Sequence, residues 1–136
     1  RTRRERYEEL SEGFFDSEDF DLLEKLPLFQ IWRDHLFAIS MCQAFSDKYE
    51  EGMFLFLSPY TNKLCREGAN EYKKLLKVKG SMPAHFHIDW LEDYIDTLHM
   101  VFNEEWSRKM AQRYLGRNPN RPQRGAYPDP DLIFYL

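Results

Sequence analysis

The stretch that decides the fold is Gly52-Met53-Phe54-Leu55-Phe56-Leu57-Ser58, a short apolar run bounded by turn residues. Polar residues occupy positions 47–51 before it, and Pro59 follows it. An uninterrupted apolar run of this length is typical of a strand that is covered on both faces, as in a parallel sheet. We therefore expect a buried strand at 53–57.

Two further elements follow this strand in the order of a parallel crossover. Residues 62–77 carry a helical stripe of apolar side chains, and Gly80 ends the pattern. Residues 84–88 form a second short run, Ala84-His85-Phe86-His87-Ile88. A strand, a helix and a strand in this order predict a βαβ unit with parallel strands. The predicted fold class is α/β.

Helices are predicted on both sides of this unit. Residues 28–45 place Trp32, His35 and Ile39 on one apolar stripe at helical spacing, while Phe37 and Met41 lie on the opposite side. This distribution predicts a helix packed between two layers. A helix capped by Asp89 and another from 103 to 115 complete the pattern. We expect an N-terminal helical arm at 1–27, the α/β domain at 28–116 and an extended tail at 117–136.

The predicted sheet has too few strands for a strand that is buried on both sides. Only residues 84–88 and the run Leu132–Leu136 are available as neighbours of the first strand. The sequence also begins with Arg1 instead of Met. We therefore expect an incomplete mixed sheet with flanking helices, whose earlier strands come from a preceding segment or from a second chain.

The composition indicates a globular protein with separated blocks of charge. Of the 136 residues 43% are hydrophobic, the net charge is −4, and there are two cysteines. No apolar stretch approaches the ~20 residues that a membrane helix needs. The two cysteines lack close spacing, which favours a reducing interior over a disulfide framework, so a cytoplasmic location is expected. Basic blocks at 1–6, 63–79 and 106–124 suit phosphate contacts if the fold gathers them on one surface. Alternatively, they are solvated helix faces that pair with neighbouring acids.

No complete active site can be found from these residues alone. Glu71-Tyr72-Lys73 matches the E-x-K pattern of metal-dependent nucleases, but positions two apart on a helix diverge by about 200°. His85 and His87 share one face of a strand and lack a third ligand at an accepted spacing. His35 lies on an apolar stripe, which favours a core histidine over a catalytic one. No metal site is predicted in this chain alone.

The long helix begins within a more specific motif, Leu26-Pro27-Leu28-Phe29-Gln30-Ile31-Trp32-Arg33-Asp34-His35-Leu36-Phe37-Ala38. It resembles the pattern P-x-x-Q-x-W-R-x-H-L-x-A of a restriction-endonuclease-like branch of the PD-(D/E)XK nuclease superfamily. The resemblance implies the C-terminal part of a DNA endonuclease domain, which contributes the post-catalytic helix and a core strand. The metal-binding Asp and the (D/E)-x-K motif would then precede Arg1. The complete domain would use a divalent metal, Mg²⁺, and bind DNA.

The resemblance also gives site residues. Gln30 takes an auxiliary catalytic role if it faces the cleft, where it and Arg33 would position a phosphate or a water. The side chains expected to contact nucleic acid are Arg1, Arg3, Arg4, Arg6, Arg33, Lys63 and Arg66. The alternatives are a buried amide for Gln30 and a surface ion pair for Arg33. The whole chain has an alternative as well, a noncatalytic protein-interaction module built on the same α/β scaffold.

Overall fold

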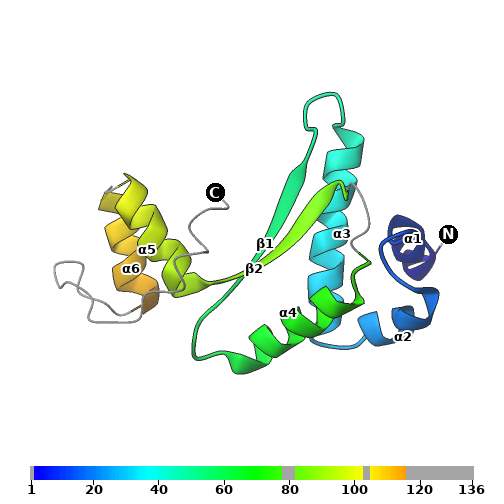
Figure 1. The fold of residues 1–136 in the computed structure, drawn as a ribbon, viewed down its shortest axis with the longest axis horizontal. Helices are drawn as coiled ribbons and strands as arrows, with labels where there is room; N and C mark the ends of the chain where they lie inside the picture. Colours follow the sequence, from blue (N-terminus) through cyan, green and yellow to red (C-terminus); the bar gives the residue numbers. More distant parts are fainter. Residues whose placement is uncertain (1, 78–81, 103–104, 116–136) are drawn as a thin grey trace. The chain divides into compact units, whose positions relative to one another are not determined.

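A computed structural model describes residues 2–77, 82–102 and 105–115. The chain divides into two compact units, Arg1–Asp89 and Trp90–Leu136. Figure 1 shows the elements in chain order: α1 (Arg3–Leu10), the 3-10 helix η1 (Ser17–Asp19), α2 (Phe20–Leu23), α3 (Leu28–Ala44), β1 (Gly52–Ser58), α4 (Lys63–Leu75), β2 (Ala84–Trp90), α5 (Leu91–Phe102) and α6 (Glu105–Leu115).

The two described strands form a parallel pair. β1 and β2 are neighbours in one sheet, and α4 is the crossover between them (Figure 1). The strands begin side by side, because the amide of Gly52 donates a hydrogen bond of 2.8 Å to the carbonyl of Pro83. The predicted βαβ unit and the α/β class are confirmed, and this small sheet is consistent with an incomplete nuclease-like fold. The candidate strand Leu132–Leu136 lies outside the described residues.

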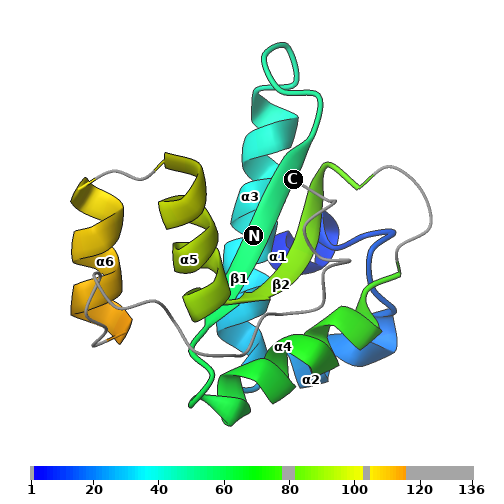
Figure 2. The same ribbon diagram turned by 60° about the vertical axis from the view of Figure 1, so that its left-hand side comes forward.

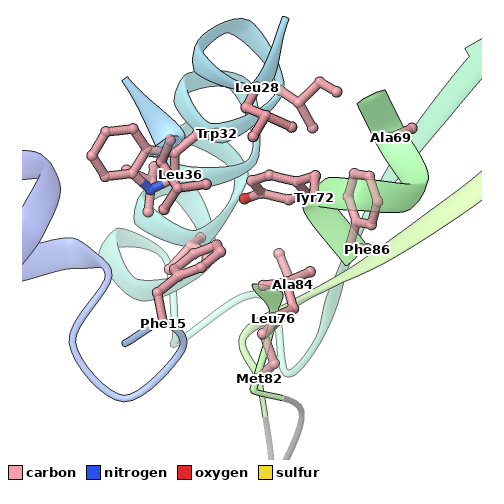
Figure 3. Close-up of a cluster of buried hydrophobic side chains, with 13 residues drawn as sticks. Phe15, Leu28, Trp32, Leu36, Ala69, Tyr72, Leu76, Met82, Ala84 and Phe86 are labelled. Carbon is pink, nitrogen blue, oxygen red and sulfur yellow. The ribbon is translucent and has the colours of Figure 1, made fainter. Parts of the chain in front are cut away.

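The core of the first unit lies where α3 and α4 pack against the sheet (Figure 2). The buried residues of α3 recur at the predicted helical spacing, so the long helix and its apolar stripe are confirmed. Figure 3 shows how Trp32, Tyr72 and Phe86 bring α3, α4 and β2 into this core. The fully buried side chains there include Leu23, Trp32, Ile39, Ala69, Tyr72 and Ala84.

Two predictions about burial were wrong. In β1 only Ser58 is buried, and Met53 is 57% exposed, so the described residues do not cover this strand on both faces. The described part of the chain also leaves the side of α3 opposite its stripe exposed, since Phe37 is 66% and Met41 41% exposed. Both errors have the same cause. Because α3 and β1 carry apolar residues on two sides, the sequence predicted a packing layer on each side. In the first unit α3 and the sheet pack against each other and against α4, and each buries one side.

The N-terminal helix is held firmly on α3. The Thr2 hydroxyl and the Glu5 carboxylate form a capping box that starts α1, which ends at Leu10 before Gly13 adopts a φ of +85°. The Tyr7 ring packs edge to face on Trp32 at 5.3 Å between centroids. The indole Nε1 of Trp32 donates to Ser11 Oγ at 2.9 Å. These contacts fix which side of α1 faces α3.

The second unit contains a pair of helices in its described part. α5 and α6 pack against each other, with Ile95 and Ala111 buried and His99 Nδ1 3.0 Å from Ser107 Oγ. The predicted cap at Asp89 was wrong, because β2 continues through Trp90 and α5 begins after it. The predicted tail at 117–136 lies outside the described residues. Within the described ranges, every helix is too short or too polar to cross a bilayer.

Candidate nucleic-acid interface

A groove of about 880 Å³ runs between α1 and α3. Three arginines selected from the sequence, Arg3, Arg6 and Arg33, lie along it. We call it the α1–α3 groove, and its lining consists of Thr2, Arg3, Arg6, Tyr7, Leu10, Arg33, Asp34, Leu36, Phe37 and Ser40. The structure thus brings together basic side chains that are about thirty positions apart in the chain.

Helical spacing explains how these residues reach one surface. Arg3 and Arg6 lie one turn apart on α1, and Arg33 and Phe37 lie one turn apart on α3. The Tyr7–Trp32 contact orients α1 so that its Arg3–Arg6 side borders α3. The groove is therefore a consequence of how the helices pack.

Arg3 is held against aromatic rings on one wall. Its Nε donates to the Tyr7 hydroxyl at 3.3 Å. Its guanidinium carbon lies 5.5 Å from the ring centroid of Tyr7 and 5.1 Å from that of Phe29. Such cation–π contacts orient a guanidinium that is otherwise exposed to solvent. The charge of Arg3 is therefore positioned by the fold.

Arg33 forms the surface ion pair that the sequence left open as an alternative. Its Nε and Nη2 both lie 2.8 Å from Oδ1 of Asp34. Hydrogen bonding to this carboxylate raises the pKa of Arg33, so the guanidinium stays charged. Asp34 also subtracts from the positive charge of the α1–α3 groove, whose lining then holds three arginines and one aspartate. Two positive charges remain in this lining.

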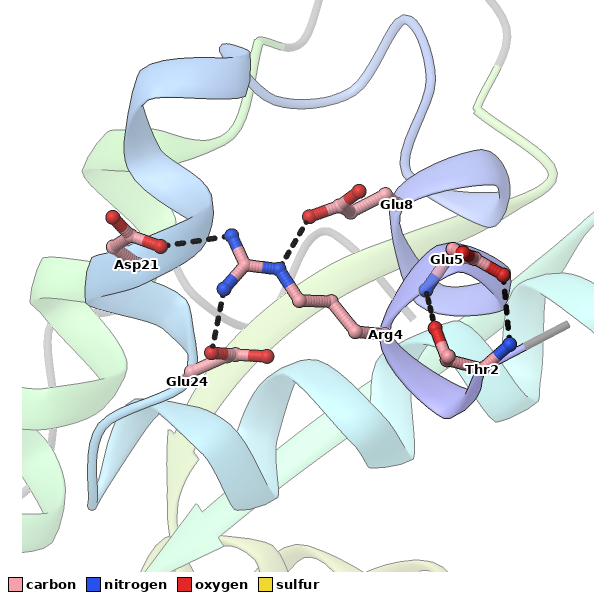
Figure 4. A network of polar contacts seen from close by, with 6 residues as sticks. All are labelled: Thr2, Arg4, Glu5, Glu8, Asp21 and Glu24. Carbon is pink, nitrogen blue, oxygen red and sulfur yellow. Dashed lines mark hydrogen bonds and ion pairs between the residues drawn. The ribbon is translucent and has the colours of Figure 1, made fainter.

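Two acidic residues of α1, Glu5 and Glu8, are held in polar contacts with Thr2 and Arg4 (Figure 4). The Glu5 carboxylate accepts from the Thr2 amide at 2.7 Å, and Glu8 Oε1 lies 2.7 Å from Arg4 Nε. Arg4 also contacts Asp21 at 2.8 Å and Glu24 at 3.0 Å, which ties α1 to α2. These three carboxylates raise the pKa of Arg4. The acids around Arg4 do not line the groove, and neither does Arg4 itself.

The remaining selected residues lie elsewhere. Gln30 is exposed on α3 one turn before Arg33, so the alternative of a buried amide was wrong. Lys63 and Arg66 stand in the first turn of α4 and do not line the α1–α3 groove. Arg1 lies outside the described residues.

Tyr7, Phe37 and Ser40 line the groove and were not selected from the sequence. The one available signal was a large apolar residue, Phe37, next to Arg33 and Asp34 on the otherwise mixed side of the helix. That side was assigned to a second packing layer, so the signal pointed to the core. Helical spacing alone does not distinguish a covered ring from an exposed one.

The described residues do not fit a divalent-metal site. Among them, no three His, Cys, Asp or Glu side chains come together in a way that would hold a metal ion. Glu71 and Lys73 are exposed on α4 with Tyr72 buried between them, so the E-x-K match lies on a helix, as predicted. The ring centroids of His85 and His87 are 6.5 Å apart.

His35 is a core histidine, as the sequence predicted. It is fully buried, with Nε2 2.8 Å from the Ala84 carbonyl and Nδ1 2.9 Å from the Tyr72 hydroxyl. Because a carbonyl only accepts, Nε2 carries the proton, and the Tyr72 hydroxyl donates to Nδ1. Burial lowers the pKa of His35 and raises that of Tyr72, so both stay neutral. Both ring nitrogens are used in holding α3, α4 and β2 together.

Comparison with known proteins agrees with the sequence motif and the fold. No curated protein and no solved structure matches the chain significantly. A family model described as PD-(D/E)XK nuclease superfamily matches residues 1–116, which include every described helix and strand. The match also covers both walls of the α1–α3 groove. The chain belongs to the PD-(D/E)XK nuclease superfamily.

Proposed function

We propose that this chain is the C-terminal portion of a metal-dependent DNA endonuclease domain and that its α1–α3 groove contacts the DNA backbone. The observation that carries the proposal is the meeting of Arg3, Arg6 and Arg33 on one groove in a member of a nuclease superfamily. The guanidinium group suits this task because its planar fork of N–H donors matches the oxygens of a phosphate.

The local charge supports the same assignment. The chain as a whole is acidic, with a net charge of −4, so it has no general attraction for DNA. The groove differs, because its lining holds three arginines and one aspartate, which leaves a positive local charge. DNA would therefore be drawn to this surface by local charge, and binding would weaken as salt rises.

The metal of such an enzyme needs ligands from elsewhere. Members of this superfamily usually use a divalent metal, and the described residues offer no cluster that fits one. In our proposal the Mg²⁺-binding carboxylates belong to a preceding segment or to a second chain that extends the sheet beside β1 or β2. In the same proposal Gln30, which is exposed on α3 one turn before Arg33, keeps the auxiliary catalytic role that the resemblance implies.

The direct test is duplex DNA binding by the full-length protein across a salt series, measured by fluorescence anisotropy. Affinity should fall steeply between about 50 and 200 mM salt, and replacing Arg3 and Arg6 by Ala should reduce the slope of log K against log salt by about two. The matched control replaces Lys73 and Lys74, two exposed cations of α4 outside the groove, by Ala. Equal losses from both pairs, or no binding at low salt, would contradict the proposal.

A protein-interaction module is the competing function, and a different surface favours it. Near the α5–α6 connection, Phe102 is 54% and Trp106 45% exposed, and their ring centroids lie 6.1 Å apart. Exposed apolar side chains that adjoin one another are typical of protein contact surfaces. This candidate takes precedence if the full-length protein neither binds DNA nor cleaves it with Mg²⁺ present.

A further inference from the structure

Phe37 adds an exposed aromatic side chain to the arginines of the α1–α3 groove. Its ring is 66% exposed and stands on α3 one turn after Arg33, within the groove lining. A single exposed phenylalanine is common on protein surfaces and has no meaning alone. Its place beside three arginines is what calls for an explanation.

The two walls of the groove supply different contacts. On α1, Arg3 and Arg6 offer charge, and Arg3 is held against the rings of Tyr7 and Phe29. On α3, Phe37 offers an open aromatic face. A basic track with an aromatic side chain along it is the combination that binds single-stranded nucleic acids, since phosphates meet the cations and bases stack on the ring.

A duplex would not use this aromatic face. In double-stranded DNA each base is stacked on its neighbours and paired, so a ring on the protein surface reaches it only after unstacking, which costs a few kcal/mol. Unpaired bases carry no such cost. The side chains of the groove are therefore better matched to a single strand than to a duplex.

We propose that the α1–α3 groove receives an unpaired stretch of DNA, with Arg3, Arg6 and Arg33 on the phosphates and one base stacked on Phe37. This rests on the proposed function and narrows its substrate to DNA that contains a single-stranded part, such as a flap, a gap or a loop.

The test compares labelled single-stranded and duplex oligonucleotides of equal length, bound to the full-length protein at low salt. The single strand should bind more tightly. Phe37→Ala should weaken single-strand binding by about 5-fold to 150-fold, the range expected for one lost base stack, and should weaken duplex binding much less. Phe37→Trp should retain single-strand affinity, and Phe37→Leu, apolar without a ring, should lose it.

Met41→Ala is the matched control, since Met41 is exposed on the next turn of α3 and does not line the groove. Because Phe37 is exposed, its variants should keep the wild-type unfolding temperature. Equal affinity for both substrates, or full affinity in Phe37→Leu, would overturn the stacking proposal. If salt-sensitive duplex binding persists in that case, the proposed function stands. If replacing Arg3 and Arg6 by Ala changes the affinity for neither the single strand nor the duplex, the proposed function itself fails.

Discussion

The hydroxyl of Tyr72 lies 2.9 Å from Nδ1 of His35, deep in the layer where α3 and α4 meet the sheet. On its other side the imidazole donates to the Ala84 carbonyl of β2. The His35 ring also packs near Phe54 and Phe86, with centroids 5.7 and 5.5 Å away. One side chain therefore contacts three elements besides its own, and its two hydrogen bonds tie α3 to α4 and β2.

Tyr72→Phe should lower the free energy of unfolding by about 1–3 kcal/mol, because Nδ1 of His35 would stay buried without its donor. The ring packing is retained in this variant, so the loss reports the hydrogen bond. Urea denaturation followed by circular dichroism measures it. Tyr49→Phe, at a 56% exposed position, is the control and should leave the midpoint unchanged. Equal midpoints for both variants would contradict the assigned bond.

Stability should fall in mild acid because burial lowers the pKa of His35. Below about pH 6.5 the unfolded chain takes up a proton on this residue and the folded chain does not, so the free energy of unfolding decreases as pH falls. The slope is at most about 1.4 kcal/mol per pH unit, and well above pH 6.5 this contribution becomes constant.

Urea titrations between about pH 7.5 and 5.5 test whether the free energy of unfolding falls as the pH falls. His35→Gln should flatten the pH dependence of the free energy of unfolding. His87→Gln, at an exposed strand position, should keep the wild-type pH dependence. An acid loss in His35→Gln that is as steep as in the wild type would show that another group controls the titration.

The sequence predicted the elements well because their signals are local. The stripe of α3 repeats at helical spacing, and the runs at 53–57 and 84–88 are bounded by turn residues. The His35–Tyr72 bond and the groove are different, since each joins residues about thirty or more positions apart. Which arginines share a surface depends on the Tyr7–Trp32 contact, and nothing in the local pattern specifies that contact.

Gly68→Ala should destabilise the first unit even though alanine is the better helix former. A Cβ atom at this position would lie 2.6 Å from Cγ of Pro27, on a ring that cannot rotate away. The overpacking should cost about 1–3 kcal/mol, against about 1 kcal/mol gained in helix propensity. Thermal unfolding measures the balance. Asn70→Ala, exposed on the same helix, should be neutral or slightly stabilising. A higher unfolding temperature for Gly68→Ala would show that α4 can move away from Pro27.

Arg3 and Arg4 are adjacent in sequence, and the structure predicts different effects when each is replaced by Ala. One substitution should lower stability, and the other should lower DNA affinity. Arg4 is held by Glu8, Asp21 and Glu24, so its loss should lower the unfolding temperature, most at low salt, because three carboxylates would face one another without their cation. It should leave DNA affinity largely unchanged. Arg3→Ala should weaken DNA binding with little effect on unfolding, because this guanidinium lines the groove.

Arg4→Lys should recover part of the stability, since the charge remains while the fork of donors is lost. Thermal unfolding and anisotropy titrations on the same preparations separate the two roles. If Arg4→Ala weakened DNA binding as much as Arg3→Ala, the arginines of α1 would bind DNA without regard to the groove. The α1–α3 groove would then not be the contact surface.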